Sequence, residues 1–279
     1  MDILQAIILG LIQGLTEFIP ISSTAHLTLV GKIFGLIDLS HPERWTAFIA
    51  IIQLGTLASV LLYFKKELVS VPKAFFKENF KPNREKISAQ SEDSKLGWYI
   101  IIGTLPIITI GLLLKKLIES EFTKSLQVIA FSLIALAIVL FIAERAAKLK
   151  KSMPDLNWKD SLWVGLAQCV ALVPGASRSG TTITAGLFLG MDRETAARFS
   201  FLLSIPAVFA SGVLQFYQAL EYVSSSDWLS IIIATVVSGI SGYASIDFLI
   251  KYLKRNTTKL FIIYRITLGL IILGYLYFI

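Results

Sequence analysis

Of the five ionisable residues inside otherwise apolar stretches of the sequence, three lie beside breaks in those stretches: Glu17, His26 and Arg178. A charged side chain at the centre of a lipid bilayer costs about 3 kcal/mol or more, so such residues mark functional sites or pair with one another. Each lies beside a break in an apolar run, and the two breaks contain Pro20 and Pro174. A carboxylate, an imidazole and a guanidinium near hydroxyl groups can perform acid–base chemistry and bind an anion.

The first break separates two short helical patterns. Gln13 and Glu17 are four residues apart and therefore share one helix face. Pro20 ends that helix, and three hydroxyl side chains follow at the start of the next: Ser22, Ser23 and Thr24. The N–H groups and the positive dipole end of a helix N-terminus favour an anion. His26 comes three residues after Ser23, so we expect it to reach the Ser23 hydroxyl from the same turn.

The second break has the composition of an oxyanion-binding loop. Gly175 and Gly180 allow the backbone to approach a ligand closely. Arg178 offers a planar fork of donors that suits phosphate. Hydroxyl side chains surround it: Ser177, Ser179, Thr181 and Thr182. Two helix N-termini, one arginine and several hydroxyls that converge on one point predict a phosphate or diphosphate site.

Each of these residues also has a structural interpretation. Serine and threonine in membrane helices often satisfy backbone groups, and Arg178 could simply neutralise Glu17. We expect Asp247 and Arg265 to pair with each other or with loop charges near the cytoplasmic end. The conjunction of two similar breaks is what favours a binding site over these readings.

The composition indicates that these elements fold in a membrane and not in water. Of the 279 residues, 55% are hydrophobic and 16% charged, whereas soluble domains have about 25% charged residues. The composition excludes a soluble enzyme and a disordered chain, and the single Cys169 excludes a disulfide scaffold. The net charge of +7 fits basic cytoplasmic loops, so no nucleic-acid partner is expected.

Runs of about 18 or more apolar residues predict transmembrane helices. Six spans are expected, at about 45–64, 96–115, 124–143, 197–219, 228–250 and 260–279. The two broken stretches, 2–37 and 161–191, have halves too short to cross a hydrocarbon core of about 30 Å. We therefore predict an all-α integral membrane protein with six transmembrane helices and two re-entrant helical hairpins.

The two broken stretches resemble each other. Gly10-Leu-Ile-Gln13 precedes the first break and Gly165-Leu-Ala-Gln168 the second, and three spans follow each. We expect a single membrane domain over 1–279, built from an inverted repeat of about 1–143 and about 158–279. Broken segments in corresponding positions of two repeats point to a site near the bilayer midplane.

Loop charge predicts the orientation. Four regions hold 19 of the 26 basic residues: 65–95, 144–160, 190–198 and 251–259. They share one side of the membrane if 2–37 and 161–191 are re-entrant, and an excess of Lys and Arg marks the cytoplasmic side. We read 65–95 as a surface connector. Both termini and the opening of the site are then expected on the outer side of the bacterial inner membrane.

Long motifs carry a family resemblance. The segment from Gln13 to His26 resembles the first signature of the undecaprenyl-diphosphate phosphatase family, also called the bacitracin-resistance family, and the segment from Pro174 to Thr182 resembles the second. Further matches are Ile52-Gln53-Leu54-Gly55, Phe199 to Pro206 and Tyr264-Arg265. The resemblance covers essentially the whole chain. It implies a membrane phosphatase that converts C55 isoprenyl diphosphate to the monophosphate carrier of cell-wall synthesis and confers bacitracin resistance.

The resemblance also implies roles for individual residues. Its functional positions fall on Glu17, Ser23, His26 and Arg178. The expected phosphate-binding residues are Ser22, Thr24, Ser177, Arg178, Ser179 and Thr182. The family often has Glu where this chain has Gln13 and Ile49, so a Mg²⁺ or Ca²⁺ site would rest mainly on Glu17, with Gln13 beside it.

Two questions of mechanism stay open at this point. Ser23 attacks with His26 as base, or His26 activates a water directly, and motif spacing does not separate these routes. Inverted repeats with broken helices are also typical of transporters, so an inverted-repeat transporter or lipid flippase is the alternative function. The expected partners are a polyisoprenyl diphosphate lipid and membrane lipid, and a homodimer is left open.

Overall fold

Six long apolar helices form the body of the protein. The computed structural model describes residues 1–38, 40–120, 123, 125–219 and 227–278, and this part of the chain has no strand. The six helices that are long and apolar enough to cross a membrane are α3 (Pro42–Tyr63), α5 (Glu92–Leu113), α7 (Leu126–Ala146), α10 (Arg193–Ala219), α11 (Trp228–Leu253) and α12 (Lys259–Phe278). They confirm the six predicted spans, except that residues 124 and 279 lie outside the described part.

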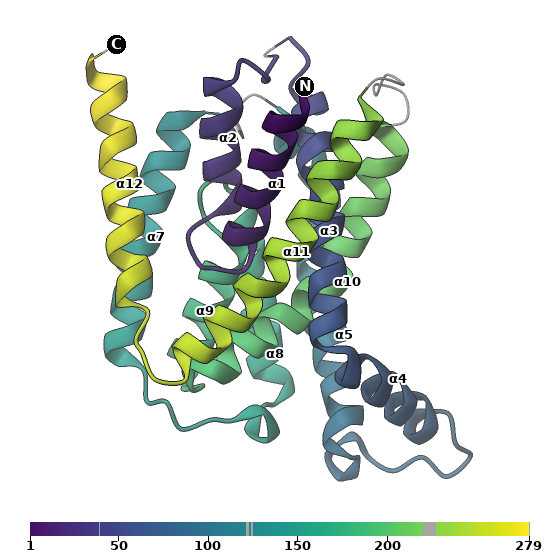
Figure 1. The fold of residues 1–279 in the computed structure, drawn as a ribbon. Coiled ribbons are helices and arrows are strands. Elements are labelled where there is room, and N and C mark those ends of the chain that lie inside the picture. The colour runs from purple at the N-terminus through teal and green to yellow at the C-terminus, as the bar shows by residue number, and fades with distance from the viewer. Residues whose placement is uncertain (39, 121–122, 124, 220–226, 279) are drawn as a thin grey trace.

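Two pairs of shorter helices correspond to the broken stretches. The first pair is α1 (Ile3–Glu17) and α2 (Ser23–Ile33); the second is α8 (Trp158–Cys169) and α9 (Arg178–Phe188), with the short helix η4 (Val170–Leu172) between them. The longest of the four has 15 residues and is therefore about 23 Å long. Figure 1 shows the α1–α2 pair in the upper half of the molecule and the α8–α9 pair in the lower half, open toward opposite ends.

The two turns share an unusual backbone conformation. Ser22 and Ser177 are the N-caps of α2 and α9, with φ of 76° and 69°. Each serine hydroxyl accepts a hydrogen bond from the N–H three residues on, in Ala25 and Gly180. A left-handed non-glycine residue costs about 1–3 kcal/mol and persists where its surroundings fix it, often at functional sites. This geometry makes Ser23 and Arg178 the first residues of their helices.

Each short pair packs against a long helix from the other half of the chain. Helix α1 lies along α11, and α8 lies along α5. Glycines permit both close approaches, because a Cβ at Gly14 would overlap the Ser241 hydroxyl and one at Gly165 would overlap the backbone of Gly103. Helices α3 and α10 also pack together, as do α7 and α12. The two halves are interleaved, which brings the two turns to the middle of the molecule.

The four basic regions meet at one end of the bundle. Ion pairs join them to each other and to neighbouring helix ends: Arg193 with Glu144, Arg198 with Glu67 and Lys254 with Glu194. A backbone bridge joins Lys151 to Met191. This is the lower end in Figure 1, whereas both termini lie at the upper end. The arrangement agrees with the expectation that these regions share one side.

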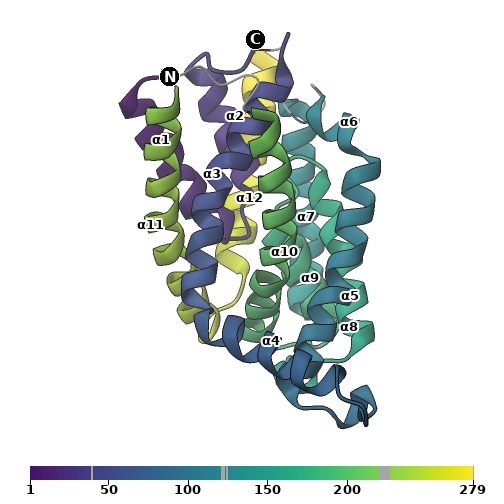
Figure 2. The same cartoon turned by 90° about the vertical axis from the view of Figure 1, so that its right-hand side faces the viewer.

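The connector between α3 and α5 contains a helix that the sequence analysis did not predict. It is α4 (Lys65–Asn79), followed by the short helix η1 (Ile87–Ala89). Helix α4 projects to the side of the bundle in Figure 1 and runs obliquely across its lower end in Figure 2. Gln90 Nε2 donates to Asn79 Oδ1 at 2.9 Å, which closes the loop. The hydroxyl and N–H of Ser91 donate to Glu78, and these two hydrogen bonds lower the pKa of that carboxyl. The remaining short helices are α6 (Lys115–Glu119) and η3 (Met153–Asp155).

Candidate active site

A cavity of about 350 Å³ lies between the two turns and helices α3, α5 and α10. One part of its wall is polar and includes Glu17, Ser23 and Arg178. The rest is largely apolar, with Ile107, Leu112, Val208 and Leu214 among its lining residues. A pocket with a few converging polar groups on an apolar wall is the usual form of a small-molecule site.

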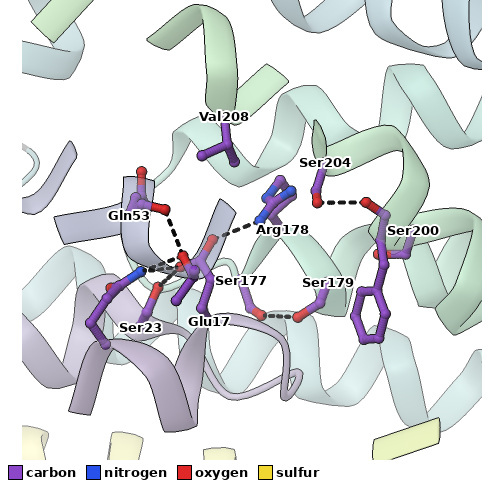
Figure 3. A network of polar contacts seen from close by, with 12 residues as sticks. Glu17, Ser23, Gln53, Ser177, Arg178, Ser179, Ser200, Ser204 and Val208 are labelled. Atoms are coloured by element: carbon purple, nitrogen blue, oxygen red, sulfur yellow. Dashed lines mark hydrogen bonds and ion pairs between the residues drawn. The ribbon is translucent and has the colours of Figure 1, made fainter. Parts of the chain in front are cut away.

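Glu17 joins the two turns at the polar part of this cavity (Figure 3). Arg178 Nη2 donates to Glu17 Oε1 at 2.6 Å. On the other oxygen, Oε2, Ser23 Oγ donates at 2.7 Å and Gln13 Nε2 at 3.0 Å. Residues from three helices therefore converge on one carboxylate, and two of them are the first residues of α2 and α9.

Burial strengthens these contacts. Glu17 is 7% exposed and Ser23 is 8% exposed. In such surroundings the effective dielectric constant is low, so the Glu17–Arg178 attraction is stronger than it would be at a surface. The second nitrogen of Arg178, Nη1, is buried and has no hydrogen-bond partner among the described residues. The salt bridge thus leaves the Nη1 group of Arg178 available to bind an anion.

Arg265 on α12 clamps the two turns together. It is fully buried, and its guanidinium donates to Pro20 O at 3.3 Å in the first turn and to Ala176 O at 3.0 Å in the second. Arg265 does not pair with Asp247; Asp247 pairs with Lys251, a basic residue of the 251–259 region, which is the other outcome expected for it. Carbonyls in turns lack helical partners, and the five N–H donors of arginine can satisfy several of them at once.

His26 does not contact Ser23 as expected. Its Nδ1 lies 2.7 Å from Ser22 O, and its Nε2 lies 2.6 Å from the Tyr264 hydroxyl on α12. The His26 and Tyr264 rings also stack, with centroids 5.6 Å apart. A helical side chain leans toward the N-terminus, so the His26 ring lies at the Ser22 carbonyl, four residues before it, and not at the Ser23 hydroxyl. His26 thus supports the turn that presents Ser23.

The predicted hydroxyl groups divide into two sets. Ser22, Thr24 and Ser177 line the cavity. Ser179 instead donates to Ile19 O at 3.3 Å, and the Thr182 hydroxyl lies 2.6 Å from that of Ser200. The second set lies behind the cavity wall and ties the turns to each other and to α10.

The groups that could hold a divalent cation are few. Within the described ranges, no cluster of three or more His, Cys, Asp or Glu side chains could ligate a metal. Gln13 Oε1, beside Glu17, is buried and has no partner in the described part of the chain. One carboxylate and one amide oxygen fit Mg²⁺, which takes its other ligands from phosphate and water.

Comparison with known families shows the family to which this chain belongs. Residues 6–271 match the family model described as bacitracin resistance protein BacA. The chain belongs to the bacitracin resistance protein family. Within that family it is 56% identical to an undecaprenyl-diphosphatase of Syntrophobacter fumaroxidans, over 96% of this chain and 95% of the relative. Identity to the undecaprenyl-diphosphatase of Chloroherpeton thalassium is 52%, over 99% and 97% of the two chains.

A more distant family member is similar over the same extent. The undecaprenyl-diphosphatase of Myxococcus xanthus is 46% identical, over 98% of this chain and 89% of the relative. The region matched to the bacitracin resistance protein family includes both turns and also Tyr264 and Arg265. Tyr264 and Arg265 were noted from the sequence as a motif, but their contacts to His26 and to both turns were not foreseen.

Proposed function

We propose that this chain is an integral membrane phosphatase that hydrolyses undecaprenyl diphosphate to undecaprenyl phosphate and inorganic phosphate at the cavity around Glu17. Relatives at 46–56% identity over nearly the whole chain bear the name undecaprenyl-diphosphatase. The observation that carries the assignment is the convergence of Ser23 and Arg178 on one buried carboxylate. Recycling of the lipid carrier fits the bacitracin resistance for which the family is named.

The cavity offers separate surfaces for the two ends of such a lipid. Arg178 Nη1 and the N-termini of α2 and α9 supply donors for phosphoryl oxygens. The apolar wall, with Ile108, Leu112 and Leu214, takes the first isoprenyl units. The diphosphate thereby lies against Ser23 while the rest of the chain extends into lipid.

The hydrogen bonds favour Ser23 as nucleophile and Glu17 as its base. Ser23 Oγ attacks the terminal phosphorus while its proton passes to Glu17 Oε2, 2.7 Å away. The bond from that phosphorus to the bridging oxygen breaks, and undecaprenyl phosphate departs with the proton from Glu17. Water then attacks the phosphoserine with Glu17 as base, and the serine oxygen regains a proton as inorganic phosphate leaves. Arg178 stabilises the negative charge of both transition states.

A Mg²⁺ or Ca²⁺ cofactor forms part of the proposal. Glu17 would hold the ion together with the Gln13 amide, once that amide turns so that its unpartnered Oε1 and not Nε2 faces the carboxylate. When bound, the ion would neutralise part of the diphosphate charge. The serine attack described above is carried by the protein's own groups.

The proposed orientation places the basic end in the cytoplasm of the bacterial inner membrane, with both termini outside. It is supported by the ion pairs that gather the basic regions at one end and by the preference of Lys and Arg for cytoplasmic loops. The α1–α2 and α8–α9 pairs are then re-entrant hairpins. The cavity also reaches Trp45 and Ile118, toward the end that carries the termini, so it opens to the outer side.

The test is phosphate release by the purified protein in detergent with C55 or C15 diphosphate as substrate. We expect release by the wild type and a large loss in Arg178→Ala with folding intact. Helix pairs that enter from opposite ends are also typical of transporters, so a transporter or lipid flippase is the competing function. Absence of release, together with movement of the lipid across liposome bilayers, would overturn the phosphatase assignment.

A further inference from the structure

Gln168 is a buried polar side chain that the mechanism above does not use. It lies in the last turn of α8, is fully buried and lines the same cavity as Glu17 and Arg178. Neither its Oε1 nor its Nε2 has a hydrogen-bond partner among residues the structure describes. Leaving both ends of a buried amide unpaired is costly, so such a group in a cavity wall points to a polar ligand.

Its counterpart in the other half of the chain explains why this amide is available. Gln13 occupies the equivalent place in Gly10-Leu-Ile-Gln13, and its Nε2 donates to Glu17, four residues on. Four residues after Gln168 stands Leu172, whose side chain offers no acceptor. The amide in the first half supports the carboxylate, whereas the amide in the second half belongs to a residue of the cavity wall and its donor is unused.

The other unpaired groups of the cavity indicate the chemistry of the ligand. Three further buried groups, on residues that line the cavity, lack partners within the described ranges: Arg178 Nη1, Trp45 Nε1 and Thr28 Oγ1. The first two are donors that cannot accept a hydrogen bond, and the Thr28 hydroxyl can donate. Glu17 already neutralises Arg178, so around this pair the surface offers hydrogen-bond donors without a net positive charge. Such a surface binds an oxygen-rich anion and still releases the product.

We propose that Gln168 binds the diphosphate of the substrate, donating from Nε2 to a non-bridging phosphoryl oxygen while Oε1 accepts from water in the cavity. The inference rests on the proposed function, because it assigns a contact in that same site. It makes Gln168 a substrate-binding residue from the second half of the chain, opposite the serine from the first half.

The experiment compares Gln168→Leu and Gln168→Glu with wild type and with Ser132→Ala. Ser132 is the matched control, because its hydroxyl is also buried without a partner in the described part of the chain but does not line the cavity. Turnover of C15 diphosphate gives kcat and KM in detergent. Thermal unfolding with and without methylenediphosphonate, a diphosphate that phosphatases do not cleave, measures binding separately from turnover.

For Gln168→Leu we expect kcat/KM to fall about tenfold or more, because one hydrogen bond to a charged ligand is lost. The stabilisation by methylenediphosphonate should shrink while the unfolding temperature without ligand stays near that of wild type. The kcat/KM of Gln168→Glu should be lower still at neutral pH, since a carboxylate repels phosphate. Its activity relative to wild type should recover from about pH 8 to pH 5 as the carboxyl protonates and regains a donor.

A kcat/KM of Gln168→Leu within twofold of wild type, with unchanged stabilisation by the ligand, would overturn the inference. If Gln168→Leu does not fold, a Gln168→Glu variant whose activity relative to wild type does not change with pH would overturn it as well. An inactive wild type would instead count against the proposed function, so the two failures are distinguishable.

Discussion

The chemistry of the site is concentrated in one side chain, Glu17. Its two oxygens have different partners, with Arg178 on Oε1 and Ser23 on Oε2. The salt bridge fixes the orientation of the carboxylate, and the second oxygen lies at hydrogen-bond distance for taking the serine proton. A carboxylate held in this way links the nucleophile to the group that binds phosphate.

A first prediction at the residue scale concerns Arg265. Replacement by Leu removes the donors to Pro20 O and Ala176 O and leaves buried carbonyls unpaired, which should lower the free energy of unfolding by about 3 kcal/mol or more. Arg265→Lys keeps the charge but cannot bridge both turns, so kcat should fall about tenfold with a smaller loss of stability. Thermal unfolding and phosphate release measure the two effects.

The control for Arg265 is Lys251→Ala, which breaks an exposed ion pair with Asp247. Such pairs contribute about 0–1 kcal/mol, so both readouts should stay near wild type. Equal activity and unfolding temperature in Arg265→Leu and wild type would contradict the clamp.

A second prediction at this scale concerns divalent cations. Chelation with EDTA should lower phosphate release, and Mg²⁺ should restore it, because Glu17 already neutralises Arg178 and a bound ion would supply positive charge for the diphosphate. Gln13→Leu should raise the Mg²⁺ concentration needed for half-maximal rate. Turnover that is indifferent to EDTA would count against Glu17 as a ligand.

The sequence identified the residue types of the site but not all of their partners. Glu17, Ser23 and Arg178 were predicted to converge, and they do. The expected His26–Ser23 contact is absent, because residue spacing shows which residues share a helical turn but not which groups of other elements lie beside each of them. The same limit hid the role of Arg265, whose acceptors are backbone carbonyls that no sequence pattern marks.

At the scale of elements, the protein depends on close packing between each short helix and a long one. Apolar runs predicted the six long helices, and the prolines and glycines predicted both turns. The partners could not be foreseen, since α1 packs on α11 and α8 on α5, far away in sequence. The connector helix α4 was missed because charged residues divide its apolar residues into short groups and Pro72 interrupts the pattern.

The element-scale prediction uses two glycines. Gly165→Ala places a Cβ against the Gly103 backbone, so α8 must move from α5, and the free energy of unfolding should fall by about 1–3 kcal/mol. Gly274→Ala in α12 is the matched control, because nothing lies within 4 Å of its Cβ position. That change should be neutral or stabilise by about 0.5–1 kcal/mol. Thermal unfolding in detergent compares them, and equal effects would contradict the close approach.

The whole molecule is organised around two opposite ends. Ion pairs and a backbone bridge gather the basic regions at one end, and the termini lie at the other. Loop charge predicted this segregation, because basic residues were already grouped between apolar runs. The position of the cavity between interleaved halves depends on tertiary packing and was expected only from the resemblance of the two breaks.

Cysteine labelling tests the orientation of the molecule. In a Cys169→Ser background, Ser40→Cys should react with a membrane-impermeant maleimide on intact cells, and Ser91→Cys should react only after permeabilisation. Both serines are exposed. Ser40 precedes α3 and Ser91 precedes α5, and these two helices begin at opposite ends of the bundle. The reverse pattern would place the basic end outside and contradict the proposed orientation.

The most direct test of the account is the rate of phosphate release from C15 diphosphate by Ser23→Ala, Glu17→Gln and Arg178→Ala. The account predicts that each variant folds and loses about 10³-fold or more in kcat/KM, because the three side chains act as one unit. Ser179→Ala, behind the cavity wall, should stay within about tenfold of wild type. A Ser23→Ala variant that releases phosphate at the wild-type rate would contradict the serine attack assisted by Glu17.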